Sequence, residues 1–360
     1  MGIEKIDKNF AKPEIKELTD VAWFNVKESP FDLYGLYNPL GEDVFKRMPS
    51  DIAKSVSEGV YSLHTHTSGG RVRFSTDSPY IAIRVTMPEG RLYMPHMPAN
   101  GQSGFDLYKD VDEISTYIFT FEPRHSDETI TATFKDLSRT MHAGMINCYT
   151  INFPLYDGVC ELEIGLKKGS YLGKGAKYKD IKPFVYYGSS ITQGGCASRP
   201  GNSYQAFISR RFNVDFINLG FSGNAKGEQE IIDYISSLDM SIFICDYDHN
   251  AATTEHLKRT HKNVYTSFRK IQKDTPILLI SRPASFIDPD FVEAQKKTII
   301  ETYNYALKNG DKNVYFLDGS TLYSGDFACD CTVDSLHPND LGFYRMAQKI
   351  GDVLEEILNK

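Results

Sequence analysis

The C-terminal half of the chain alternates short apolar runs with longer amphipathic stretches. A short apolar run favours a buried strand, whereas apolar residues three and four positions apart favour one face of a helix. Ile231, Ile232 and Ile235 show the helical spacing. Strands that alternate with helices of this length predict βαβ units, and therefore a three-layer α/β/α domain on a parallel sheet. The predicted strands are 184–187, 214–217, 241–245, 276–280 and 314–317, and the predicted helices are 203–212, 228–238, 254–273, 290–307 and 341–358.

The N-terminal half has a different pattern. Short runs rich in Val, Ile, Thr, Tyr and Phe recur between turn-forming sequences such as Ser68-Gly69-Gly70 and Asn100-Gly101. Glycine and asparagine favour turns because they tolerate a positive φ. The spacing predicts an all-β sandwich, similar to a jelly roll. Its predicted strands are 60–67, 71–75, 80–87, 117–122, 129–134, 146–153 and 161–166.

The length of 360 residues agrees with two domains, since single hydrophobic cores stop growing beyond roughly 250–300 residues. A polar, glycine-containing stretch at 174–182 separates the two patterns. We therefore expect a β-sandwich domain over residues 1–178 and an α/β domain over residues 179–360.

Charge and composition narrow the function classes. The formal net charge is −7 with no basic run, which argues against a nucleic-acid surface. No apolar stretch approaches the roughly 18 residues of a membrane helix, and residues 1–5 lack the apolar core of a signal peptide. We expect a cytoplasmic protein, or a secreted one if a leader was trimmed. The six cysteines have no spacing typical of a disulfide framework, so free thiols are expected.

Two short motifs carry side chains suited to nucleophilic catalysis. Gly188-Ser189-Ser190 follows an apolar run, and Asp334 precedes His337 by three residues on a later loop. A serine hydroxyl is a weak nucleophile until an imidazole takes its proton, and the imidazole needs an acceptor on its other nitrogen. Ser190, His337 and Asp334 are the candidates for these three parts.

Each motif also has an ordinary structural interpretation. Gly-Ser-Ser is common in loops, and Asp-x-x-His-Pro can begin a helix with the aspartate as N-cap. The position of the motifs favours catalysis, because ligands of open α/β sheets bind beyond the carboxyl ends of the strands. Four loops, after 184–187, 216–219, 242–245 and 314–317, would converge on one edge.

In this order, the motifs resemble the blocks of the SGNH, or GDSL-like, hydrolase family. Gly188-Ser189-Ser190 is similar to the family's Gly-Asp-Ser, which implies that Ser190 is the nucleophile. The sequence from Asp334 to His337 is similar to the family's Asp-x-x-His and implies the acid and the base. Residues 218–224 resemble the second block and imply that the backbone N–H of Gly223 binds the oxyanion.

The third family block, Gly-x-Asn-Asp, is matched in part. Asn250 takes the place of its oxyanion asparagine, but Asp248 replaces the glycine and Ala251 replaces the acid. In the N-terminal half, residues 104–108 read Gly-Phe-Asp-Leu-Tyr and resemble the Gly-x-Asp-Leu-Tyr signature of the β domain that precedes one branch of the family. An α/β-hydrolase fits less well, because Thr192 stands where its Gly-x-Ser-x-Gly motif needs the last glycine.

The resemblance implies a flavodoxin-like SGNH fold and a serine esterase that uses no metal or cofactor. Ser190 would attack an ester carbonyl while His337 takes its proton, and the N–H groups of Ser190 and Gly223 with the Asn250 amide would bind the oxyanion. The implied substrates are small O-acyl esters, such as acetyl esters of carbohydrates. Two alternatives stay open: an acyltransferase with the same triad, and a non-catalytic glycan-binding protein. The sequence leaves the oligomeric state open.

Three other clusters have simpler interpretations. His64 and His66 could bind a metal from one strand face, but we interpret them as the exposed polar face of an edge strand. Residues 246–249 concentrate oxygen and imidazole groups of the kind that bind metals, although Asp246 is better explained as a strand-end residue that holds its loop. Cys196 is expected to pack near Ser190 without reacting.

Overall fold

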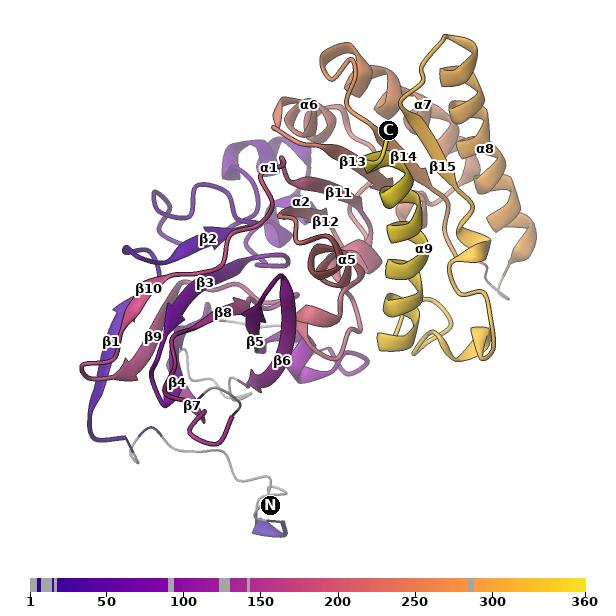
Figure 1. Ribbon diagram of the computed structural model, residues 1–360. Coiled ribbons are helices and arrows are strands. Elements are labelled where there is room, and N and C mark those ends of the chain that lie inside the picture. The colour runs from indigo at the N-terminus through magenta and orange to yellow at the C-terminus, as the bar shows by residue number, and fades with distance from the viewer. Residues whose placement is uncertain are drawn as a thin grey trace.

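The computed structural model of the chain describes residues 5–7, 15, 18–89, 94–122, 130–140, 143–283 and 288–360. Figure 1 shows a β-rich N-terminal half beside a C-terminal half in which helices surround a central sheet. Residues 1–4 and Thr129, the first residue of one predicted strand, lie outside the described residues.

The N-terminal half forms two antiparallel sheets, which confirms the predicted β architecture. The strands are β1 Val21–Asn25, β2 Asp32–Tyr34, β3 Arg71–Thr76, β4 Tyr80–Thr86, β5 Phe105–Val111, β6 Ile114–Phe121, β7 Ile130–Asp136, β8 Asn147–Asn152, β9 Glu161–Lys167 and β10 Leu172–Lys174. One sheet has the order β1-β9-β4-β7, and the other has the order β10-β3-β8-β5-β6 with β2 beside β3. Phe74, Ile83 and Leu107 belong to the apolar cluster shared by both sheets.

The strand predicted at 60–67 is wrong, because residues 60–63 belong to a helix and His66 forms only an isolated β-bridge. The chain forms α1, Ser50–Val56, and α2, Glu58–Leu63. Ser57 begins α2, since its side chain accepts a hydrogen bond from the Val60 N–H at 3.1 Å. Val60 and Leu63 pack into the same apolar cluster, so their three-residue spacing is one face of a helix. A further short helix, α3, spans Ala99–Gln102.

The C-terminal half is a parallel five-stranded sheet with helices on both faces, as predicted. The strands are β11 Phe184–Gly188, β12 Phe216–Gly220, β13 Ile242–Asp246, β14 Ile277–Ile280 and β15 Val314–Leu317, and the helices are α4 Ser190–Gln193, α5 Tyr204–Phe212, α6 Gln229–Ser237, α7 Thr254–Ile271, α8 Pro289–Lys308 and α9 Asp340–Leu358. The strand order is β12-β11-β13-β14-β15. This is the flavodoxin-like order 2-1-3-4-5, whose switch point lies between the first and third strands, here β11 and β13.

Alternate side chains of β11 point to opposite faces of the sheet. Val185 and Tyr187 pack in the cluster that α6, α7 and α8 cover, whereas Phe184 and Tyr186 pack in the cluster that α5 and α9 cover. Burial on both faces explains why the strands are continuous apolar runs. Met48 and Ala53 of the N-terminal half also belong to the first cluster. The domain boundary at residues 178 and 179 stays a prediction.

Two arginines join the sandwich to β12. Arg47 is 1% exposed, and its guanidinium donates to the carbonyl oxygens of Asn218 at 3.0 Å and Gly220 at 2.6 Å. Arg71 of β3 forms an ion pair with Asp215, directly before the same strand. The sandwich therefore contacts β12 at both of its ends.

The state of the cysteines agrees with the sequence analysis. All six cysteines are free thiols. In the part of the chain that the structure describes, no helix is long and apolar enough to cross a membrane.

Candidate active site

Three of the predicted site residues follow neighbouring parallel strands at the same edge of the sheet. Ser190 comes two residues after β11 ends, Gly223 comes after β12, and Asn250 comes after β13. Because β11 and β13 flank the switch point, their loops open a crevice for a ligand there. His337 reaches the same place from the loop before α9.

Ser190 is the more accessible of the two adjacent serines. It is the first residue of α4 and half-buried, whereas Ser189 is completely buried. The Ser189 side chain caps α4 by accepting a hydrogen bond from the Ile191 N–H at 3.2 Å. The local structure thus uses one serine of the pair as a helix cap and presents the other at the sheet edge.

Hydrogen bonds connect the serine, the histidine and the aspartate. Ser190 Oγ lies 2.9 Å from His337 Nε2, and His337 Nδ1 lies 2.7 Å from Asp334 Oδ2. The other carboxylate oxygen of Asp334 accepts from the backbone N–H groups of Leu336 at 3.0 Å and His337 at 2.7 Å. The aspartate therefore holds both the loop and the imidazole. α9 has a different N-cap, Asn339.

The hydrogen bonds also set the charge of Asp334. Partial burial acts to raise the pKa of this carboxyl, but the hydrogen bonds from His337 and Leu336 outweigh it and hold the pKa below its usual value. A carboxylate that stays ionised beside the ring stabilises an imidazolium, which is the charge that forms when the base takes a proton.

Gly223 and Asn250 lie on the loops that follow β12 and β13, the two strands that flank β11. Gly223 has φ +68°, a conformation in which a side chain would be strained. The Asn250 amide donates to the Phe221 carbonyl oxygen at 3.0 Å, and the Asn224 N–H donates to the same oxygen at 2.9 Å. Asn250 is thereby tied to the turn that carries Gly223. Among the described residues, the backbone N–H groups of Ser190 and Gly223 have no acceptor.

The sandwich also contacts residues 189–196, which carry Ser190 and are called the serine loop below. The sequence analysis missed these contacts. Tyr156 donates its hydroxyl to the Ser190 carbonyl oxygen at 3.0 Å. Gln193 links three segments: its Nε2 lies 3.2 Å from His66 Nδ1, and its Oε1 accepts from the Ser222 N–H at 3.0 Å. No local pattern marks these residues, because their partners lie far away in the sequence.

The interpretation of His64 and His66 as an exposed strand face is wrong. His64 is 4% exposed and ends α2, while His66 is half-buried against Gln193. Burial, with Arg47 and His64 nearby, lowers the pKa of His66 to about 3. His66 is therefore neutral near pH 7 and accepts or donates a hydrogen bond without carrying charge.

Asp246, the last residue of β13, and Asp248, two residues later, are both buried. Asp246 is 2% exposed, and burial together with Asp248 raises its pKa well above the usual value. Asp248 accepts a hydrogen bond from the Arg282 backbone N–H at 2.9 Å. This contact explains the residue that replaces the family glycine: it fastens the loop of Asn250 to the chain after β14. His249 is neutral, since burial, with Arg282 and His337 nearby, lowers its pKa well below the usual value.

A loop of the sandwich brings His96 close to His337. The ring centroids of His96 and His337 are 5.7 Å apart. Cys196, which is 2% exposed, completes a group of three potential metal ligands with these histidines, and the ligand atoms all lie within 4.8 Å of one another. The predicted position of Cys196 near Ser190 is confirmed, because it lies beside His337. Its expected lack of reactivity stays a prediction.

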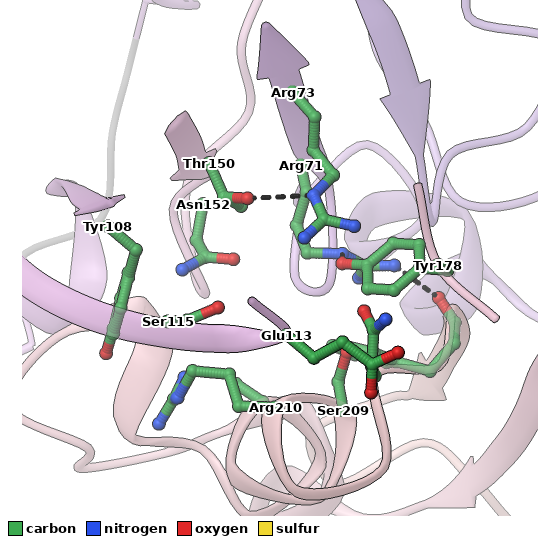
Figure 2. Close-up of a pocket in the computed structure, with 13 residues that line it drawn as sticks. Arg71, Arg73, Tyr108, Glu113, Ser115, Thr150, Asn152, Tyr178, Ser209 and Arg210 are labelled. Atoms are coloured by element: carbon green, nitrogen blue, oxygen red, sulfur yellow. Dashed lines mark hydrogen bonds between the residues drawn. The ribbon is translucent and has the colours of Figure 1, made fainter. Parts of the chain in front are cut away.

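A separate polar pocket lies where β3, β8 and α5 meet, with an empty volume of about 370 Å³ including its open mouth. Figure 2 shows Arg71 and Arg73 above it, with Tyr178 beside them and Arg210 below. Phe216, at the first position of β12, lines this pocket, whereas Gly223 follows the other end of that strand. The pocket is thus at the opposite edge of the sheet from Ser190.

Comparison with protein families gives two matches. Residues 181–355 match the GDSL-like lipase/acylhydrolase family, and residues 21–172 match the N-terminal domain of SGNH-type esterases, which is named for the GxDLY signature. A solved GDSL-like lipase from Bacteroides ovatus is 30% identical, and the match covers 94% of this chain and 98% of that one with a TM-score of 0.85. The chain belongs to the GDSL-like lipase/acylhydrolase family. It is therefore a hydrolase that acts on ester bonds, in which an N-terminal β domain precedes a domain with the SGNH fold.

More distant structures share the fold. The salicylyl-acyltransferase SsfX3 from a tetracycline biosynthetic pathway is 18% identical over 95% of this chain and 99% of that one, with a TM-score of 0.76. An acetyl xylan esterase from Butyrivibrio proteoclasticus is 14% identical over 94% of this chain and 99% of that one, with a TM-score of 0.57. No curated protein matches the sequence.

Proposed function

We propose that this GDSL-family hydrolase cleaves small O-acyl esters through a triad of Ser190, His337 and Asp334. The observation that carries the proposal is the continuous hydrogen-bonded chain from Ser190 Oγ through the imidazole to the Asp334 carboxylate, at 2.9 and 2.7 Å. Nucleophile, base and orienting acid are each within the reach that proton transfer needs.

The reaction has two stages. Ser190 Oγ bonds to the ester carbonyl carbon while its proton passes to His337 Nε2, and the imidazolium then gives that proton to the departing alcohol. Water, deprotonated by the same nitrogen, hydrolyses the acyl-enzyme and restores Ser190. The backbone N–H groups of Ser190 and Gly223 and the second amide N–H of Asn250 stabilise the negative carbonyl oxygen in both stages.

Acetyl esters of carbohydrates are the proposed substrate class. The support is the fold shared with an acetyl xylan esterase and with a family two carbohydrate esterase from Clostridium thermocellum in complex with cellohexaose. Both are 14% identical, so the proposal for this chain needs its own test. The sandwich loop that carries His96 borders the proposed base, which gives the N-terminal half a position from which to contact a sugar.

An acyltransferase is the second candidate, favoured by the fold shared with SsfX3 over nearly the whole chain. The triad serves both reactions, because an alcohol can replace water in the second stage. Product analysis distinguishes them: a hydrolase releases free acid at a rate that added sugar alcohols leave unchanged, whereas a transferase forms new ester in proportion to the added alcohol.

The substrate proposal is tested with a panel of esters that differ in acyl chain and alcohol. We expect acetyl esters of sugars to give higher kcat/KM than acyl chains of eight or more carbons on the same alcohol. Ser190→Ala is the control for hydrolysis by other groups. A preference for long acyl chains, with acetylated sugars untouched, would contradict the carbohydrate assignment while leaving the triad in place.

A further inference from the structure

The group formed by His96, Cys196 and His337 has the composition of a transition-metal site. Two imidazoles and one thiol offer the nitrogen and sulfur donors that Zn²⁺ prefers. Their ligand atoms lie within 4.8 Å of one another. Ligand atoms of a tetrahedral zinc ion are about 3.5 Å apart, as the Zn–N and Zn–S bond lengths require, so closing the group needs movements of about 1 Å.

The three ligands differ in how freely they can make this movement. His96 is exposed and comes from a sandwich loop, so its ring can turn without disturbing a packed core. Cys196 and His337 are held by the serine loop and the α9 loop. A Cβ placed on Gly195 would meet the Cδ2 atom of His337 at 3.4 Å, which shows how closely the chain next to Cys196 passes the imidazole.

His337 is already arranged as a zinc-binding histidine. Its Nδ1 is 2.7 Å from the Asp334 carboxylate, and metal-bound histidines almost always donate their second ring N–H to a carboxylate, a carbonyl or water. The nitrogen left for a metal is Nε2. In the metal-free protein that atom lies 2.9 Å from Ser190 Oγ, so the metal and the nucleophile compete for it.

We propose that His96, Cys196 and His337 form an inhibitory binding site for Zn²⁺ or a chemically similar divalent ion, which switches the esterase off by occupying His337 Nε2. Binding forms one Zn–S and two Zn–N bonds, and the thiol proton is released to solvent. Water completes the tetrahedral shell. No electron is transferred, and a chelator reverses the reaction.

The inhibition depends on the proposed role of His337 as the base, whereas binding of the metal does not. The site is built from both halves of the chain, since His96 belongs to the sandwich and the other two ligands to the α/β half. A metal there also joins His96 of the sandwich to the imidazole that lies beside Ser190.

The first test measures ester hydrolysis by metal-free enzyme as Zn²⁺ is added. We expect the wild type to lose its activity and to regain it with EDTA. His96→Ala and Cys196→Ser, each compared with its own metal-free activity, should need at least roughly 10- to 100-fold more Zn²⁺ for half-inhibition, because loss of a ligand costs no less than loss of the group that supports one. Cys329→Ser is the matched control, because Cys329 is an exposed thiol outside the group.

The second test follows Co²⁺ binding by absorption, which needs no catalysis. We expect a thiolate-to-cobalt band in the wild type and in Ser190→Ala, and its loss in Cys196→Ser, with circular dichroism to confirm folding. An active wild type that resists Zn²⁺, a missing thiolate band, or equal inhibition of all variants would overturn the site. If Ser190→Ala instead remains an active esterase, the proposed triad fails, and the cobalt band still decides the metal site.

Discussion

Asp334 has two structural roles, one for each of its carboxylate oxygens. One carboxylate oxygen organises the loop by accepting two backbone N–H groups, and the other orients the His337 ring. Ser335 between them has φ +69°, an uncommon conformation for a residue other than glycine. The turn therefore brings acid and base together within four residues, which is why this part of the site was readable from a local motif.

Substitutions of Asn250 test the part of the site where the family block is incomplete. Its amide is proposed to donate to an oxygen that becomes negative only in the transition state, so Asn250→Ala should lower kcat by about 10²- to 10³-fold and leave KM nearly unchanged. Asn250→Asp should be at least as damaging, because a carboxylate has no donor and adds a like charge. Steady-state kinetics on one ester measure both variants.

The control for this prediction is folding, since Asn250 also donates to Phe221 O. Circular dichroism and the thermal midpoint of each variant show whether that turn survives. A folded Asn250→Ala enzyme with nearly unchanged kcat would mean that the third loop does not hold the oxyanion. The replacement of the family glycine by Asp248 would then mark a real difference in the site.

At the scale of elements, the period of apolar residues predicted the α/β half well. Helices α5 to α9 and strands β11 to β15 lie where the pattern placed them, within a few residues. The strand prediction at 60–67 was wrong because valine, tyrosine and threonine favour strands. In the structure, Ser57 caps a helix, and Val60 and Leu63 bury one face of it. Tertiary packing decided between two local preferences.

The parts of the site that sequence could not supply are the contacts between distant elements. Tyr156, His66 and His96 reach the serine and histidine loops from the sandwich, over separations of 34, 127 and more than 200 residues. The two residues of the Asp-x-x-His motif are only three positions apart, so the motif can be recognised in a single sequence. Contacts of this kind follow from the docking of the two halves, which no short motif encodes.

Helix α1 and the residues before it should contribute to the stability of the α/β half. Met48 is fully buried in the cluster beneath α6 and α7, so Met48→Ala leaves a cavity and should lower the free energy of unfolding by about 2–5 kcal/mol. Leu40→Ala is the matched control, because Leu40 is 69% exposed. Urea unfolding measures both. Equal stability of the two variants would show that this segment does not pack as described.

At the scale of the whole molecule, the two halves behave as one packed unit around β12. Arg47 of the N-terminal half donates to carbonyl oxygens of that strand, and Met48, Ala53 and Val60 fill its apolar cluster. A fragment that begins near residue 179 would lack these side chains. The sequence predicted two domains from the change in pattern at the junction, but the contacts across that junction leave no pattern in the sequence.

Buried histidines should make the folded protein sensitive to acid. Burial lowers the pKa of His261 to about 3, against about 6.5 in an unfolded chain. Between these values the unfolded state binds the proton first, so stability is complete above pH 6.5 and falls as the pH decreases toward 3. One such histidine contributes a slope of about 1.4 kcal/mol per pH unit.

Urea unfolding at several pH values between 7.5 and 4 checks this prediction. His261→Gln should reduce the slope, because glutamine does not titrate. His66, whose pKa is also about 3, adds a second contribution that remains in this variant. A free energy of unfolding that stays constant or rises as the pH is lowered from 6.5 to 4 would contradict the burial of these rings in neutral form.

The identity of the nucleophile is the central claim, and covalent labelling tests it most directly. A fluorophosphonate reacts much faster with a serine that a base has activated than with other hydroxyls, so peptide mass spectrometry of the labelled chain locates that serine. We predict one adduct on Ser190 in the wild type and in Ser189→Ala, and none in Ser190→Ala, whose kcat for ester hydrolysis falls by roughly 10⁴-fold or more. An adduct on Ser189, or full ester hydrolysis by Ser190→Ala, would contradict the account.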